Sequence, residues 1–257
     1  MALRETSLRP PSARLIRWEI FAVFAVSLGA DAVNAILDLI RSLLATTPLS
    51  KQHVALVASA AANSWLDLAI QLVSIAEVLA PVVLVLYLMA RSGESPSLIG
   101  LDASQPGRDA ARGAVLAAVI GGTGLGLYLA AYRLGFNVNV VPEALPAVWW
   151  RIPVLLLNAV QNGVLEEILM IGYLFRRLDQ LGWQPGRIIA VSAFIRGCYH
   201  LYQGFGGFLG NAAMGVIFGL LYRRWGRVTP LIVAHTLIDA GAFIGYVALR
   251  GKVSWLP

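Results

Sequence analysis

The stretch WRIPVLLLNAVQNGVLEEILMIGYLF, residues 150–175, has the length and apolar character of a helix that crosses a membrane. About 20 mostly apolar residues are enough to span the hydrocarbon core of a bilayer. Two adjacent carboxylates, Glu166 and Glu167, interrupt this stretch. Because a charge in hydrocarbon is costly unless it is paired or hydrated, such residues are expected to be functional.

The composition of the 257-residue chain points to the same class of protein. Hydrophobic residues make up 58%, the mean hydropathy is +0.72, and charged residues make up 13%. A globular domain usually carries about 25% charged residues, and so few charges could not cover the outside of a core this large. The composition therefore argues against a water-soluble enzyme and excludes a disordered chain. The long, unalternating apolar runs also exclude a membrane β-barrel, whose strands alternate over about 10 residues.

The apolar runs predict an all-α, polytopic integral membrane helical bundle with about seven transmembrane helices. The expected spans are 18–38, 66–90, 113–133, 150–175, 188–203, 208–222 and 229–249. Residues 1–112 are expected to form an N-terminal arm, two transmembrane helices and a cytoplasmic linker, and residues 113–257 the remaining helices.

The basic residues predict the orientation in the membrane. With the amino terminus in the cytoplasm, thirteen of the 20 Lys and Arg residues fall in cytoplasmic segments and six fall on the other side. Cytoplasmic loops are enriched in Lys and Arg, so the count favours a multi-pass protein of the cell membrane with its amino terminus inside. This asymmetry explains the net charge of +6. We therefore expect the lipid bilayer as a partner, and no nucleic acid.

Three of the predicted helices each carry a pair of ionisable residues. Glu166 and Glu167 point about 100° apart on their helix and can serve two different neighbours. On the other two helices the pairs are four residues apart, and therefore on one face; they are Arg196 with His200 and His235 with Asp239. The spacing is compatible with a single site between the helices.

Two chemistries suit such a group of side chains. A carboxylate and an imidazole can share a water molecule and remove its proton, and a second imidazole can donate to an oxyanion. Alternatively, Glu166, His200 and His235 form a possible zinc ligand set with an open position. Both chemistries predict hydrolysis of an amide by activated water. The first requires no cofactor, whereas the second requires a divalent metal such as zinc. The structural alternative is a buried hydrogen-bond network that only fixes helix packing.

The motifs resemble those of the CPBP family, the CAAX-prenyl-protease-type and bacteriocin-processing (Abi) intramembrane proteases. The family pattern is E-E-x-x-x-R, then F-x-x-x-H, then H-x-x-x-N or H-x-x-x-D. The corresponding segments are Glu166-Glu167-Ile168-Leu169-Met170-Ile171, Arg196-Gly197-Cys198-Tyr199-His200 and His235-Thr236-Leu237-Ile238-Asp239. The resemblance covers about residues 150–245.

The resemblance implies an intramembrane endopeptidase. Glu166 with His200 would activate the water, and His235 with Asp239 would bind the oxyanion or complete the site. Glu167 would position its neighbours. The substrate would be a membrane-associated peptide or protein that arrives from the cytoplasmic leaflet.

The chain departs from the family pattern at two positions. Ile171 replaces the motif arginine, and Arg196 replaces the motif phenylalanine. An arginine four residues after Glu167 could pair with it along one helix face. We expect Arg196 to supply the same guanidinium from the neighbouring helix, which would make the intramembrane charge tolerable.

Two other functions remain open at the level of sequence. A member of the family that has lost catalysis could act in immunity or as an adaptor. A transporter could use the polar stripes that contain Asp31 and Glu77, although such stripes are more often buried seams between helices. Small-residue pairs at Gly122/Gly126 and Gly215/Gly219 allow close helix packing within the chain or in a dimer.

Overall fold

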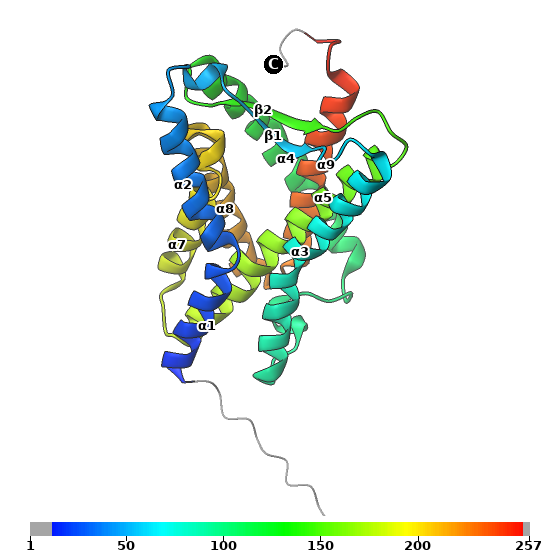
Figure 1. The fold of residues 1–257 in the computed structure, drawn as a ribbon. Coiled ribbons are helices and arrows are strands. Elements are labelled where there is room, and N and C mark those ends of the chain that lie inside the picture. Colours follow the sequence, from blue (N-terminus) through cyan, green and yellow to red (C-terminus); the bar gives the residue numbers. More distant parts are fainter. Residues whose placement is uncertain (1–11, 254–257) are drawn as a thin grey trace, which may run out of the picture.

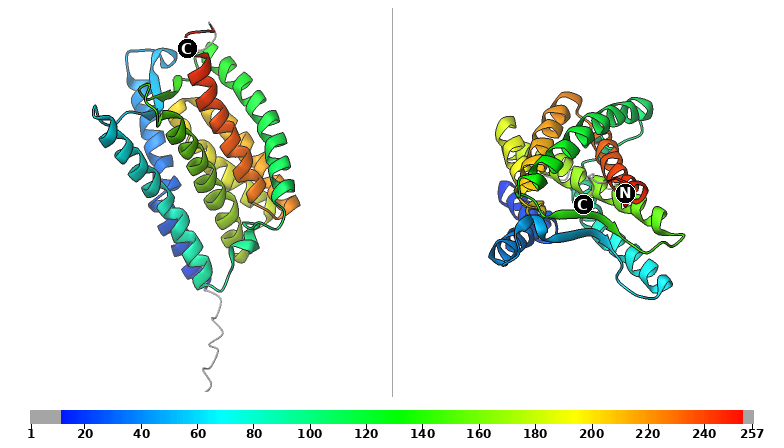
Figure 2. Two further views of the ribbon diagram at one scale, coloured as in Figure 1. Left: turned by 90° about the vertical axis from the view of Figure 1, so that its right-hand side faces the viewer. Right: turned by 90° about the horizontal axis from the view of Figure 1, so that it is seen from above.

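The structure is a computed structural model that describes residues 12–253. Its helices form a bundle of roughly parallel and antiparallel rods (Figure 1; Figure 2). The main elements are α1 (Ala13–Ala25), α2 (Leu28–Leu44), β1 (His53–Ala58), α3 (Ser64–Arg91), α4 (Pro106–Arg133), β2 (Asn139–Ala144), α5 (Arg151–Glu166), a π-helical turn η3 (Glu167–Tyr173), α6 (Leu174–Gln180), α7 (Pro185–Cys198), α8 (Phe205–Trp225) and α9 (Thr229–Leu249). Short 3₁₀ turns lie at η1 (Leu49–Lys51), η2 (Pro96–Ile99) and η4 (Leu201–Gln203).

The all-α polytopic membrane bundle is confirmed, but the expected number of spans is corrected. Five helical segments of the described chain are long and apolar enough to cross a membrane. The bent pair α1–α2, with an angle of 49°, can supply a sixth. Helix α7, predicted as a span, has 14 residues and is therefore only about 21 Å long at 1.5 Å per residue. It packs along α8 as a short helix (Figure 1).

A small parallel sheet, which the sequence did not predict, lies at one end of the bundle. Strand β1 pairs with β2 in the register His53↔Asn139 to Ala58↔Ala144. The sheet lies at the end where α9 finishes, opposite the start of α1 (Figure 1). Asp67 and Gln71 of α3 fasten the far end of β1, since Gln71 Nε2 donates to the carbonyl of Ala58 at 2.8 Å. These two residues of the polar stripe on α3 therefore hold the helix against β1, whereas Glu77 of the same stripe is exposed.

The segment from α5 through α6 forms the centre of the bundle. In its most apolar window 67% of residues are buried, against 6% in α4 and 22% in α3. Gly163 allows α9 to approach α5, because a Cβ there would lie 2.6 Å from Thr236 Oγ1. The outer helices expose many large apolar side chains, as helices that face lipid do; examples are Leu37, Val83 and Val119.

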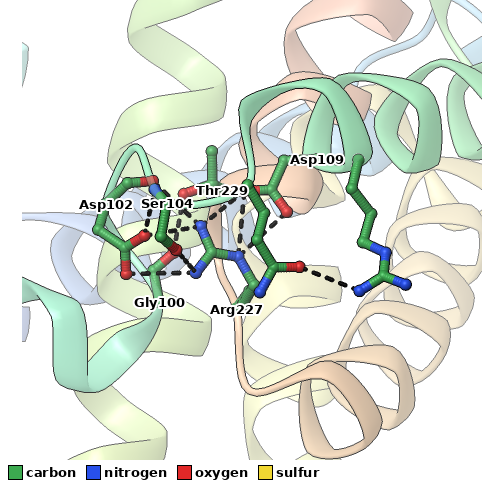
Figure 3. Close-up of polar contacts among 8 residues, drawn as sticks. Gly100, Asp102, Ser104, Asp109, Arg227 and Thr229 are labelled. Carbon is green, nitrogen blue, oxygen red and sulfur yellow. Dashed lines mark hydrogen bonds and ion pairs between the residues drawn. The ribbon is translucent and has the colours of Figure 1, made fainter.

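A second polar cluster closes the opposite end of the bundle (Figure 3). The Arg227 guanidinium, in the turn between α8 and α9, donates to both carboxylates of Asp102 and Asp109. It also donates to Ser104 Oγ at 3.1 Å. Hydrogen bonds from Arg227 hold the pKa of Asp102 well below its usual range. Its hydrogen bonds to Asp109 and Asp102 in turn raise the pKa of Arg227. The cluster links the α8–α9 turn to the segment before α4, and it thereby fixes the position of the start of α9 relative to α4.

Candidate active site

The two glutamates of the central helix lie where its geometry changes. Glu166 is the last residue of α5, and Glu167 is the first of the π-helical turn. Such π-bulges often occur at functional sites. Glu167 is fully buried, and Glu166 is 8% exposed. The two carboxylates therefore face different surroundings, as their predicted divergence on the helix requires.

Glu167 forms the centre of a buried triad with one residue from each of two other helices. Its Oε1 accepts hydrogen bonds from Arg196 Nη2 of α7 and from His235 Nδ1 of α9, both at 2.7 Å. Arg196 is fully buried and His235 is 4% exposed. The expected pairing of Arg196 with Glu167 is present, while Ile171 at the lost motif position is buried. Arg196 thus supplies a guanidinium to Glu167 from the neighbouring helix.

Gly215 allows α8 to pack closely against α7 beside the Arg196 side chain. A Cβ on Gly215 would lie 2.9 Å from the Cα of Ala193 and 3.3 Å from Cδ of Arg196. The Gly215/Gly219 pair therefore serves close packing within the chain, between α7 and α8. The Arg196 guanidinium also lies over the ring of Phe218, 5.6 Å from its centroid.

Glu166 pairs with the end of α7. Its Oε2 accepts a hydrogen bond of 2.6 Å from the Tyr199 hydroxyl and lies 3.9 Å from Arg196 Nη1. His200 Nδ1 lies 2.9 Å from the carbonyl oxygen of Arg196. Because a carbonyl only accepts, Nδ1 must carry the proton, and Nε2 of a neutral His200 is left with its lone pair. His200 therefore has a free basic nitrogen next to the Tyr199–Glu166 pair.

The last predicted pair is oriented by a residue that the sequence analysis missed. His235 Nε2 lies 3.8 Å from Asp239 Oδ2. Asn162 of α5 donates from Nδ2 to the same Oδ2 at 2.8 Å. Asn162 precedes Glu166 by four residues, so both lie on one face of α5. That spacing is the sequence signal that could have identified Asn162; Tyr199, next to His200, offered no comparable signal.

A cavity of about 910 Å³ joins these groups. Four of the six predicted site residues line it: Glu166, His200, His235 and Asp239. Glu167 and Arg196 do not line the cavity. They contact residues that do, namely His235 and Glu166. Asn162 and Tyr199 also line the cavity, as do Asp31, Asn34 and Asp38 of α2. The stripe on α2 is thus a wall of the cavity rather than a closed seam.

The cavity occupies the half of the bundle that carries the sheet. Its lining on α4 falls within positions 117–128, on α8 within 206–214 and on α9 within 235–249. In each helix these positions lie toward the sheet, since α4 leads into β2, the N-terminus of α8 follows the Gly204–Asn137 bridge and α9 contacts β2. The start of α1 lies at the other end (Figure 1). If the amino terminus lies in the cytoplasm, this half of the bundle lies on the side away from the cytoplasm, opposite to the leaflet from which the sequence analysis expected the substrate.

The comparison with known families agrees with this arrangement of residues. Residues 148–241, which include α5, the π-helical turn and His235 with Asp239, match the family described as type II CAAX prenyl endopeptidase Rce1-like. The match covers just over a third of the chain, and it agrees with the resemblance of the motifs to CAAX-type proteases. No curated protein and no solved structure gave a significant match. The match supports a protease of the CAAX endopeptidase type, and with the apolar helices it indicates an integral membrane protein.

The family pattern at His235–Asp239 is complete, but the expected zinc set is not formed. Among residues 12–253, no three or more His, Cys, Asp or Glu side chains are grouped so as to hold a metal ion. Hydrogen bonds with Tyr199, the Arg196 carbonyl and Glu167 orient Glu166, His200 and His235. As they are arranged, these three side chains are not grouped as a metal site, and we derive no step through a metal.

Proposed function

We propose that the protein is an intramembrane endopeptidase in which Glu166 and His200 activate water. The observation that carries this is the placement of a carboxylate and a free imidazole nitrogen on the wall of one cavity within the bundle. A positioned base of this kind typically contributes a factor of about 10² to 10⁴ in rate. The buried Arg196–Glu167 pair holds His235 and keeps the second charge out of the cavity.

The proposed reaction starts from a water molecule between Glu166 and His200. Glu166 takes one proton from the water, and the oxygen attacks the carbonyl carbon of the peptide bond. The resulting oxyanion accepts a hydrogen bond from Nε2–H of His235, whose Nδ1–H is held by Glu167. As the C–N bond breaks, the proton on Glu166 passes to the leaving amine. Asp239 and Asn162 orient the ring of His235 from the other side.

The proposed substrate is a membrane-associated peptide or protein. It reaches the cavity at the end of the bundle that carries the sheet. With the amino terminus inside, as the distribution of basic residues favours, this is the leaflet away from the cytoplasm. The orientation can be tested with an impermeant thiol reagent on intact cells, because Cys198 is buried. A Lys51→Cys variant should be labelled and an Arg187→Cys variant should not; the opposite result would place the cavity on the cytoplasmic side.

Cleavage itself is tested in proteoliposomes with a panel of quenched-fluorescent, membrane-anchored peptides. The panel includes a farnesylated CAAX peptide, the class that the family description names, and unlipidated helical peptides. Glu166→Gln should lower kcat by at least about 100-fold, because it removes the base but keeps the shape. Glu77→Gln makes the same change on an exposed residue of α3 and should leave the rate unchanged.

The same measurements separate the proposal from the alternatives. No cleavage of any peptide by the wild type, or equal cleavage by Glu166→Gln, would favour a non-catalytic family member that acts in immunity or as an adaptor. Ion or proton flux that depends on Asp31 or Glu77, without a role for His235, would favour a transporter.

A further inference from the structure

One edge of the small sheet has no partner. In the ladder, the N–H of Asn139 donates to the carbonyl of Gln52 at 2.8 Å. Backbone groups alternate in direction along a parallel strand, so those of Val54 and Leu56 face β2. The N–H and C=O groups of Ala55 and Val57 then point away from β2. Within the described residues they form no hydrogen bond.

The opposite edge of the sheet is closed. The N–H of Val140 in β2 donates to the Tyr128 hydroxyl at 3.0 Å. Pro142, two residues further along the same edge, has no N–H to offer. A strand can therefore be added to β1 but not to β2.

A polar cavity of about 360 Å³ lies against the open edge of β1. Three consecutive residues, Ala55, Leu56 and Val57, line it. Because successive side chains point to opposite faces of a strand, a wall of consecutive residues means that β1 presents its backbone edge to the cavity.

Amide side chains form the opposite wall. Asn158, Gln161 and Asn162 of α5 line the cavity. Gln161 is 7% exposed; its Nε2 donates to Asn162 Oδ1, and its Oε1 has no partner among the described residues. Unpaired amide groups are costly at membrane depth unless something occupies the space beside them. The amide side chains of α5 thus offer hydrogen-bond donors and acceptors to a ligand that lies between α5 and β1.

The polar cavity adjoins the cavity of the candidate active site. Leu56, Val78, Asn162 and Tyr202 border both. Asn162 is also the residue that holds Asp239. A chain bound along β1 would therefore lead directly past the groups that carry the proposed reaction.

We propose that the substrate binds in an extended conformation as a third strand on the open edge of β1. This inference rests on the proposed function. A peptide in a membrane must satisfy both of its backbone edges. One edge would pair with Ala55 and Val57, and the other would meet the amides of α5. A lipid chain has no groups to match the alternating donors and acceptors, whereas strand addition uses them directly.

The test uses a peptide from the panel that the wild type cleaves and Glu166→Gln does not. Ala55→Pro removes an outward N–H without removing a donor from the β1–β2 ladder. It should lower kcat/KM about five- to tenfold, mainly through KM, because about one backbone hydrogen bond is lost. Ala55→Val keeps the N–H and adds a comparable side-chain volume, so its kcat/KM should fall less than that of Ala55→Pro, and the difference between the two variants measures the loss of the N–H. Unchanged thermal midpoints would show that both variants fold.

A second measurement uses the wild-type protein and does not depend on the variant folding. The same peptide is made with a single N-methyl group at each backbone position in turn. Strand addition predicts that the fall in kcat/KM alternates along the peptide and is largest at the positions whose amides point to β1.

Equal kinetics for Ala55→Pro and Ala55→Val, together with a non-alternating N-methyl profile, would overturn strand addition and leave the proposed function intact. If the wild type cleaves no peptide in the panel, or if Glu166→Gln cleaves as well as the wild type, the proposed function fails and strand addition fails with it.

Discussion

Arg196 can be replaced by phenylalanine, the residue that the family pattern has at this position. This change tests whether Arg196 on α7 takes the role of the motif arginine, whose position is occupied by Ile171. Arg196 and Glu167 are both fully buried, 2.7 Å apart. Without Arg196, Glu167 keeps only His235 as a partner, and its Oε2 already has none. Removing one partner of a buried ion pair costs about 3–5 kcal/mol, because the other charge is left buried without compensation.

The free energy of unfolding in detergent micelles should therefore fall by about 3–5 kcal/mol in Arg196→Phe. Adding Ile171→Arg places a guanidinium at the motif position on the helix of Glu167, and it should recover more than half of the loss. Adding Glu167→Gln instead removes the orphaned charge and should also recover part of it, as a double-mutant cycle would show. Arg41→Phe makes the same substitution in an exposed ion pair with Asp38 and should cost less than about 1 kcal/mol.

Cleavage should follow the same order, because Glu167 holds His235 in place. Arg196→Phe should lose activity, and Arg196→Phe with Ile171→Arg should regain it. The compensation hypothesis is wrong if Arg196→Phe is as stable and active as the wild type and the double variant gains nothing.

Three further results follow from the geometry. Tyr199→Phe removes the hydroxyl that donates to Glu166 at 2.6 Å. It should lower kcat about 10- to 100-fold in the peptide assay, since a hydrogen bond to a charged group is worth about 1.5–3 kcal/mol; an unchanged kcat would separate Tyr199 from the site. Asp239→Asn should keep most activity, because the family pattern accepts either residue there, whereas Asp239→Ala should lose it; equal rates would remove Asp239 from the mechanism. Arg227 lowers the pKa of Asp102, so the carboxylate stabilises the fold above its unfolded pKa of about 3.9. The difference in thermal midpoint between wild type and Asp102→Asn should therefore be constant above about pH 5 and shrink as the pH falls below about 4, and a difference independent of pH would contradict this.

The spacing of residues along helices predicted much of the arrangement of the candidate site. Pairs four residues apart lie on one helix face whatever the tertiary structure, so Arg196 with His200 and His235 with Asp239 could be assigned from sequence. That the three helices meet depends on close approaches such as that of Gly163 to Thr236. A single sequence does not reveal which glycine faces which helix. The family resemblance supplied that step, and the geometry agrees with it.

The number of spans was harder to predict, because hydropathy does not measure helix length. The run 188–203 is mostly apolar, yet α7 ends at Cys198, and the chain turns through Leu201–Gln203 before α8. Its apolar side chains are needed inside the bundle: Ile188 and Ala193 are buried, as is the functional Arg196. A short buried helix and a membrane span share this composition, and only packing separates them.

The sheet could not have been placed from local sequence. His53–Ala58 is a short apolar segment rich in valine and alanine, and its partner Asn139–Ala144 lies beyond two long helices. Parallel strands require such a crossover, so no nearby turn motif marks the pair. The position of the sheet beside the catalytic cavity follows from the same crossover, because α3 and α4 carry the chain away from that end of the bundle and back to it. The element that sequence reasoning missed is therefore the one on which the proposed substrate would bind on its way to Glu166.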